Sequence, residues 1–138
     1  MSVKFNIVVR GNPGDREAAK KYYPSIQSSG RVTTRELAEM AAERSTLSTM
    51  DMMAAIESFL AIVPQQLAKG NIVELGDFGS FWLRTISDGA DTPDEVNATQ
   101  ISSVLPRFNP GKKFKQMLKM IEFTRGLIVR EPEAEPGD

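Results

Sequence analysis

Residues 76–84 read Gly-Asp-Phe-Gly-Ser-Phe-Trp-Leu-Arg, and residues 106–115 read Pro-Arg-Phe-Asn-Pro-Gly-Lys-Lys-Phe-Lys. The first stretch has the pattern of a tight glycine turn that opens a strand. The second has the pattern of a strand that runs into a lysine-rich helix, with Asn109 as the N-cap, Pro110 at the first helical position and an end near Ile121. These two stretches carry most of the information about the fold.

Two helices are predicted upstream of the glycine turn. Thr33 and Glu36 have the spacing of a capping box, in which each side chain satisfies a free backbone amide at the start of a helix. Ser48 and Asp51 mark a second helix start, and that helix should cover about residues 49–69. Apolar residues cover more than one side of the second helix, which favours burial from several directions. We expect the core of a dimer there, with a methionine-rich binding groove as the alternative.

The ends of the chain are predicted to add strands to this arrangement. Residues 3–10 alternate apolar and polar side chains, and residues 22–28 and 122–129 have similar strand patterns. The first and last of these strands should pair with each other, because an isolated strand is not stable. Residues 131–138 hold acids and no large apolar residue, so a loose tail is expected.

The charge is unevenly distributed along the chain. The whole chain has a formal net charge of −1. Residues 87–104 carry −4 and residues 131–138 carry another −4, which leaves +7 for the rest. A chain that is nearly neutral overall can therefore present a basic surface to a polyanion. The alternative is that the remaining cations are spread evenly.

The composition excludes several kinds of site. The chain has no cysteine and no histidine, so disulfides and triads built on either residue are excluded. We expect no catalytic site, no metal, no cofactor and no small-molecule substrate. No apolar run approaches the roughly 18 residues of a membrane span, so we expect no membrane partner and a cytoplasmic location.

The two quoted stretches resemble the HU/IHF family of bacterial histone-like DNA-binding proteins. That family has a Gly-x-Phe-Gly-x-Phe turn and strand where this chain has residues 76–81. It has Pro-x-Phe-x-x-Gly-Lys before its last helix where this chain has residues 106–112. Between the two, the family has a hairpin arm, as this chain is predicted to have at residues 87–97.

The resemblance divides the chain into three parts. Residues 1–31 are an N-terminal β extension, residues 32–121 are the HU/IHF-like domain, and residues 122–138 are a C-terminal strand and acidic tail. These additions look like those of the longer variants found in Bacteroidetes-type bacteria.

The resemblance implies an α+β fold in which two chains intertwine as a homodimer, with a helical base and a β-sheet that carries an arm hairpin. Phe78, Phe81 and Phe108 match the family's core aromatic residues. The implied function is that of an architectural protein of the nucleoid, which binds double-stranded DNA through its backbone with little sequence preference. The alternative is an HU-fold structural or protein-interaction module that has lost DNA binding.

The candidate DNA-binding residues are all cations. Arg84 matches a basic position at the base of the family's arm. Lysines at helical spacing form a stripe on the last helix, nearly opposite its apolar side, and such a stripe can follow phosphates or be an ordinary solvated face. The full set is Arg84, Arg107, Lys112, Lys113, Lys115 and Lys119.

The arm departs from the family pattern. Family arms carry arginines beside a proline that enters the minor groove and wedges a base step. Here Pro93 lies near the expected tip without a flanking arginine, and the acids around it are Asp88, Asp91, Asp94 and Glu95. Because these carboxylates would repel phosphates, we expect that the arm does not intercalate and that Pro93 is a turn residue.

Overall fold

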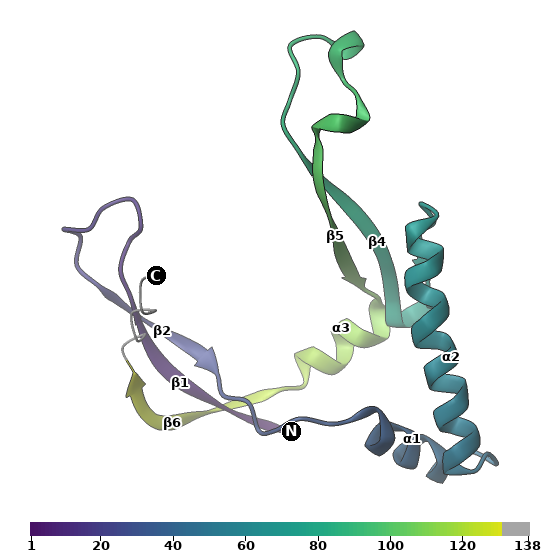
Figure 1. Cartoon of the computed structure of the whole chain (residues 1–138). Coiled ribbons are helices and arrows are strands. Elements are labelled where there is room, and N and C mark those ends of the chain that lie inside the picture. Colours follow the sequence, from purple (N-terminus) through teal and green to yellow (C-terminus); the bar gives the residue numbers. More distant parts are fainter. Residues whose placement is uncertain (131–138) are drawn as a thin grey trace, which may run out of the picture. The chain divides into compact units, whose positions relative to one another are not determined.

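The computed structural model describes residues 1–130, so the predicted acidic tail at residues 131–138 lies outside the described residues. The chain forms two compact units (Figure 1). The terminal unit contains residues 1–31 and 119–130, and the central unit contains residues 32–118. No helix within residues 1–130 is long and apolar enough to cross a membrane.

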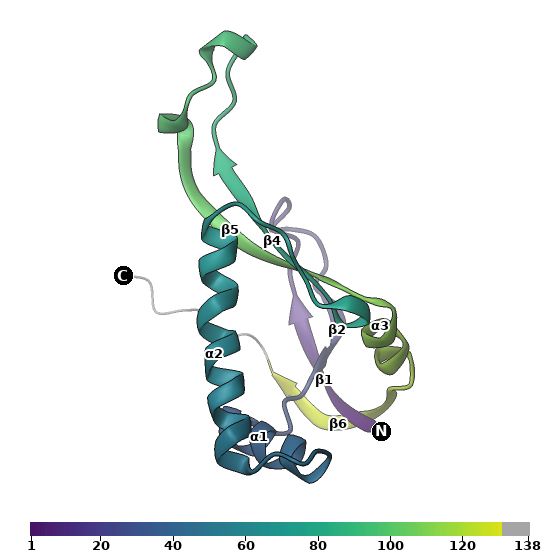
Figure 2. The same cartoon turned by 90° about the vertical axis from the view of Figure 1, so that its right-hand side faces the viewer.

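The central unit combines helices with an antiparallel sheet, and the predicted α+β class is confirmed. The sheet has the order β3-β4-β5, and β4 and β5 run side by side to a loop at their far end (Figures 1 and 2). The elements are α1 (Thr34–Glu43), α2 (Thr49–Ala68), β3 (Val73–Glu74), β4 (Gly79–Ser87), β5 (Ile101–Pro110) and α3 (Lys112–Lys119).

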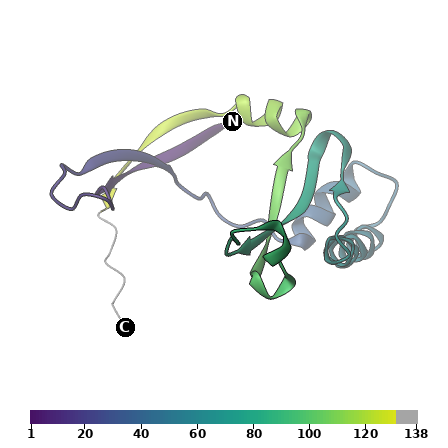
Figure 3. The same cartoon turned by 90° about the horizontal axis from the view of Figure 1, so that it is seen from above.

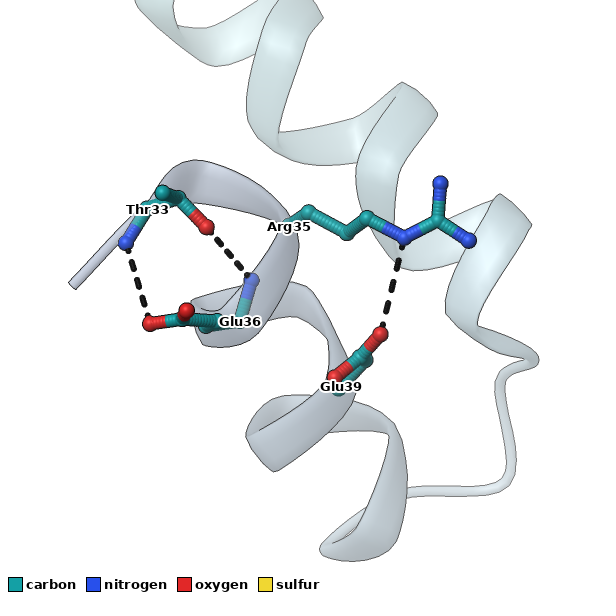
Figure 4. Close-up of polar contacts among 4 residues, drawn as sticks. All are labelled: Thr33, Arg35, Glu36 and Glu39. Atoms are coloured by element: carbon teal, nitrogen blue, oxygen red, sulfur yellow. Dashed lines mark hydrogen bonds and ion pairs between the residues drawn. The ribbon is translucent and has the colours of Figure 1, made fainter.

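Both predicted helix starts are confirmed by their caps. Thr33 Oγ1 accepts a hydrogen bond from the Glu36 amide at 3.3 Å, and Glu36 Oε2 accepts one from the Thr33 amide at 3.3 Å (Figure 4). Ser48 Oγ accepts from the Asp51 amide at 3.1 Å at the start of α2. Each such cap is worth about 1 kcal/mol, because it satisfies amides that have no partner inside the helix.

The two sequence stretches that predict the fold pack directly against each other. Gly79 at the start of β4 pairs with Pro110 at the end of β5. The Gly111 amide donates to the Phe78 carbonyl at 2.9 Å. A Cβ atom at Gly111 would lie 2.6 Å from the backbone carbon of Asp77, so only glycine allows this approach.

The predicted start of the last helix is wrong. Asn109 and Pro110 belong to β5 rather than to an N-cap, and α3 begins at Lys112 and ends at Lys119, before Ile121. The reason is the partner strand, because β4 extends to Gly79 and keeps Asn109 and Pro110 in the ladder. Proline is tolerated here because β5 is an edge strand of the sheet.

Four aromatic rings pack against one another between the sheet and α3 and form an aromatic core that is only partly covered in the single chain. The ring centroids of Phe81 and Phe108 are 4.9 Å apart, and Phe114 of α3 lies 5.3 Å from both Phe78 and Phe108. Such pairs contribute about 0.5–1.5 kcal/mol each beyond the area they bury. These ring contacts support the predicted packing role of Phe78, Phe81 and Phe108, although none of the three is buried within the single chain.

The terminal unit is a sheet of three strands with the order β2-β1-β6. Its strands are β1 (Ser2–Arg10), β2 (Lys21–Ile26) and β6 (Glu122–Arg130). β1 pairs antiparallel with β2 and parallel with β6, which confirms the predicted pairing of the two ends of the chain. Figure 3 shows β1 (purple) and β6 (yellow-green) side by side.

Candidate nucleic-acid interface

Arg84 and Arg107 lie on one face of the central sheet. Arg84 pairs with Leu105, and Arg107 pairs with Trp82. Because side chains alternate between the faces of a strand, all four residues share a face. The two arginines are diagonal neighbours in the ladder, a separation of about 7–8 Å between backbones. Both are exposed, so this pair can reach two adjacent phosphates.

The candidate lysines of α3 lie on the far side of that helix from the aromatic core. Phe114 contacts Phe78 and Phe108, which fixes the side of α3 that meets the sheet. At 100° per residue, Lys112, Lys115 and Lys119 are turned at least about 100° away from Phe114. They are exposed, as is Lys113.

The structure does not bring the six candidate cations into one patch of the chain. Phe81 and Phe108 occupy the sheet face that α3 covers, and Arg84 and Arg107 occupy the opposite face. The candidates therefore form two groups, a pair on the sheet and a stripe on α3. Sequence spacing predicted both groups, but it could not show that they lie on opposite sides of the β4–β5 sheet.

None of the six candidates is engaged in an ion pair with another residue of the described chain. Among residues 1–126, whose side chains the structure describes, the one ion pair joins Arg35 to Glu39 at 3.5 Å (Figure 4). The candidate cations thus keep their charge available for an external anion. Contacts of this type position a nucleic acid without reading its sequence.

The arm is built as an irregular acidic loop rather than as an extended tip. Pro93 begins a short 3₁₀ turn, Pro93–Glu95, in which the Val96 amide donates to the Pro93 carbonyl at 3.3 Å. The prediction that Pro93 is a turn residue is confirmed. All four arm acids, Asp88, Asp91, Asp94 and Glu95, are exposed.

Sequence reasoning missed where the surplus of positive charge lies. Up to residue 130, the terminal unit has nine cations and three acids, a net charge of +6. The central unit has eight cations and eleven acids, a net charge of −3, and without the acids of residues 87–104 it carries +1. The net charge of +7 predicted for the chain without its two acidic segments, residues 87–104 and 131–138, therefore lies almost entirely in residues 1–31 and 119–130. Counting charges by structural unit reveals this, but the units are defined only by the pairing of β1 with β6.

The central unit exposes a large apolar surface on α2. Ala38 and Leu67 are the only buried apolar side chains among its described residues. On α2, 82% of Met50, 55% of Leu60 and 53% of Ile62 are exposed. Leu60 and Ile62 lie on nearly opposite sides of α2, and a helix that is apolar around its circumference is typically covered from several directions.

Comparison with known proteins relates the chain to one family. The family model described as an HU domain fused to a wHTH, Ig or glycine-rich motif matches residues 1–125. The DNA-binding protein HU of Thermus thermophilus is 32% identical over 94 residues, which cover 64% of this chain and 93% of the relative. The integration host factor subunit beta of Marinobacter nauticus is 34% identical over 91 residues, which cover 63% of this chain and 92% of the relative.

Two solved structures share the fold. A crystal structure from Bacteroides vulgatus matches 97% of this chain with a TM-score of 0.61 and 13% identity, and this chain spans 50% of its length. The match to an HU–DNA cocrystal structure from Anabaena covers 64% of this chain and 99% of the HU chain, with a TM-score of 0.53 and 22% identity. At these identities the likeness concerns the fold alone.

Proposed function

The chain belongs to the family of HU domains fused to further motifs, and from this premise we propose that it is an architectural protein of the nucleoid that binds duplex DNA as a homodimer. The observation that carries the proposal is the set of exposed cations without an ion-pair partner in the described chain, placed on the β4–β5 sheet and on α3. The proposal assigns the protein no catalytic role.

The mode of binding follows from the kind of side chains present. The candidates are arginine and lysine, which pair with phosphate oxygens, and each contact releases condensed counterions. Arg84 and Arg107 would hold one segment of the backbone, and the lysines of α3 would hold another. Such contacts give affinity that depends strongly on salt and weakly on sequence.

The exposed apolar surface supports the dimer. Burial of Met50, Leu60 and Ile62 against a second chain would stabilise the dimer by about 25 cal/mol for each square ångström of apolar surface covered. Sedimentation equilibrium at micromolar concentration should show a dimer, and the variant L60E/I62E should shift it to monomer. A wild-type chain that sediments only as a 15.2 kDa species contradicts this part of the proposal.

The DNA contact is tested with the variant K112A/K115A/K119A. Its binding to a labelled 30-base-pair duplex is measured by fluorescence anisotropy across a range of salt concentrations. The slope of log K against log salt should flatten by about 0.9 for each lost contact, and several unrelated duplex sequences should lose affinity equally.

A matched control removes three exposed cations that lie elsewhere in the central unit, in the variant R35A/R44A/K69A. The control should change the slope by much less than the α3 variant. Equal slopes for the α3 variant and the wild type would remove α3 from the interface.

A second function is favoured by the acidic arm and the net charge of −3 on the central unit. It is that of an HU-fold structural or protein-interaction module without DNA binding. A wild-type protein that does not bind duplex DNA even at about 50 mM salt, where electrostatic attraction is strong, would select this second function.

A further inference from the structure

The terminal sheet has two unlike faces. Strand alternation and the register of β1 with β2 place Lys4, Arg10, Lys21 and Tyr23 on one face. The other face holds apolar residues, among them Phe5, Ile26 and Phe123. The charged face and the adjoining loop between β1 and β2, residues 11–20, contain no ion pair within the described chain.

Two cations are held directly opposite each other at the end of this sheet. Arg10 of β1 pairs with Lys21 of β2, so their side chains emerge together on the same face. Like charges in this position destabilise a hairpin. The Arg10 guanidinium lies 6.0 Å from the ring centroid of Tyr23, which holds the charge near its neighbour instead of letting it swing away. A bound anion would relieve the repulsion between these two cations.

The loop beside this pair is ordered by its own hydrogen bonds. The Asp15 amide donates to the Asn12 carbonyl at 3.1 Å, which closes a β-turn with Pro13 in its first central position. Asn12 Oδ1 accepts from the Gly14 amide at 2.9 Å. A loop that is ordered before binding loses less conformational entropy when it binds.

A pocket of about 590 Å³ opens between the loop and the cation pair. It is lined by Arg10, Asn12, Lys21 and Tyr23 among others, and so combines two cations, an amide and an aromatic ring. The same loop carries two exposed cations, Arg16 and Lys20, and two exposed acids, Asp15 and Glu17, so the positive charge at the pocket comes from Arg10 and Lys21. The pocket is large enough for a phosphodiester group and offers no carboxylate to repel it.

We propose that this basic hairpin of β1 and β2, with the Arg10–Lys21 pair at its centre, is a second DNA-contacting element that holds a backbone phosphate of the duplex. The inference rests on the proposed function in taking DNA as the partner, but it concerns a different surface from Arg84, Arg107 and α3. Residues 1–31 and 119–130 carry a net charge of +6, which the four acids of residues 131–138 partly offset, so the cations of this hairpin would add to the electrostatic attraction to DNA.

The closing experiment compares full-length R10A/K21A with K112A/K115A/K119A and with the control R35A/K69A, which removes one arginine and one lysine elsewhere. Binding to the 30-base-pair duplex is measured over 50–300 mM salt. The R10A/K21A slope should flatten by about 0.9, the value for one lost phosphate contact, and affinity near 0.1 M salt should fall by roughly 10-fold. The control slope should stay within about half a unit of the wild type.

Two further readouts separate a binding role from a structural one. The melting temperature of R10A/K21A should stay level or rise, because the change removes a like-charge pair. The variant R10K should keep most of the wild-type slope, since the charge is retained. Photocross-linking to iodouracil-substituted duplex DNA should label the tryptic peptide of residues 22–31, which contains Tyr23.

The outcomes distinguish the two proposals. An unchanged slope in R10A/K21A, with a flattened slope in the α3 variant, overturns this inference and leaves the proposed function standing. If R10A/K21A loses affinity for a duplex RNA while its affinity for duplex DNA is unaltered, the assignment of this hairpin to DNA is overturned. A wild-type protein that binds no duplex DNA overturns both proposals.

Discussion

The two hairpins of this molecule have opposite charges. The β4–β5 hairpin ends in an arm with four exposed acids, and the β1–β2 hairpin ends in a loop flanked by Arg10 and Lys21. The arm occupies the position that the family resemblance assigns to insertion into the minor groove, but its charge opposes that role. The difference indicates that the topology of a hairpin and its ability to bind DNA are separable, because the backbone ladder sets the first and exposed side chains set the second.

The two hairpins also differ in how tightly they are anchored, and the largest effect is expected at the base of β4–β5. In Gly111→Ala, the new Cβ would lie 2.6 Å from the Asp77 carbon and 2.9 Å from the Gly79 nitrogen. These are backbone atoms that cannot yield, so the free energy of unfolding should fall by about 3 kcal/mol. Denaturant unfolding measures it.

Gly89→Ala in the arm is the matched control for that change. No atom lies within 4 Å of a Cβ placed at Gly89, so the control should alter the free energy of unfolding by no more than about 0.5 kcal/mol. Similar losses in the two variants would show that the base of this hairpin is not the anchor.

A smaller loss is expected at the corresponding close approach in the terminal sheet. A Cβ at Gly126 would lie 2.8 Å from Asn6 Oδ1 and 3.0 Å from the Phe5 carbonyl oxygen. The amide of Asn6 can turn aside, and Oδ1 has no hydrogen-bond partner in the described chain to lose. Gly126→Ala should therefore cost about 1 kcal/mol. Thermal unfolding checks this, and a loss as large as that of Gly111→Ala would contradict it.

Removing the arm acids should sharpen the contrast in charge. Replacing Asp88, Asp91, Asp94 and Glu95 with serine removes repulsion worth about 1 kcal/mol in total at low salt, so DNA affinity at 50 mM salt should rise several-fold. The gain should disappear near 0.3 M salt, where screening hides the acids. Anisotropy titrations at the two salt concentrations measure both effects. An affinity that falls would show that the acids support a DNA-binding conformation.

The smallest effect is expected for Pro93→Ala. Pro93 begins a short turn among acids, and inserting a wedge costs a few kcal/mol that no neighbouring arginine offsets. DNA affinity should change by less than about twofold, and DNA bending, measured by fluorescence energy transfer between the duplex ends, should stay the same. A severe loss of bending would establish that the arm wedges DNA despite its charge.

Much of the fold could be predicted because its signals are local. The capping residues Thr33 and Ser48 mark helix starts, since their side chains satisfy amides only three residues away. The glycine turn before β4 and the alternation of residues 3–10 are equally local patterns. The predicted start of α3 was wrong because Pro110 fits locally both the first position of a helix and the end of a strand. Only its pairing with Gly79 decides between the two.

The order of amino acids sets which kinds of residue are available. These are cations without histidine or cysteine, an acidic arm, and two glycine-bearing stretches that resemble one family. Tertiary structure alone decided how these residues are grouped. β6 returns to pair with β1, which gathers the positive charge of both chain ends into one unit. Packing of Phe114 against Phe108 sets the lysines of α3 on the opposite side of the sheet from Arg84 and Arg107. The pairing of the chain ends could be predicted from their strand patterns. The charge that this pairing gathers, and the side on which the lysines lie, depend on contacts between residues far apart in the chain.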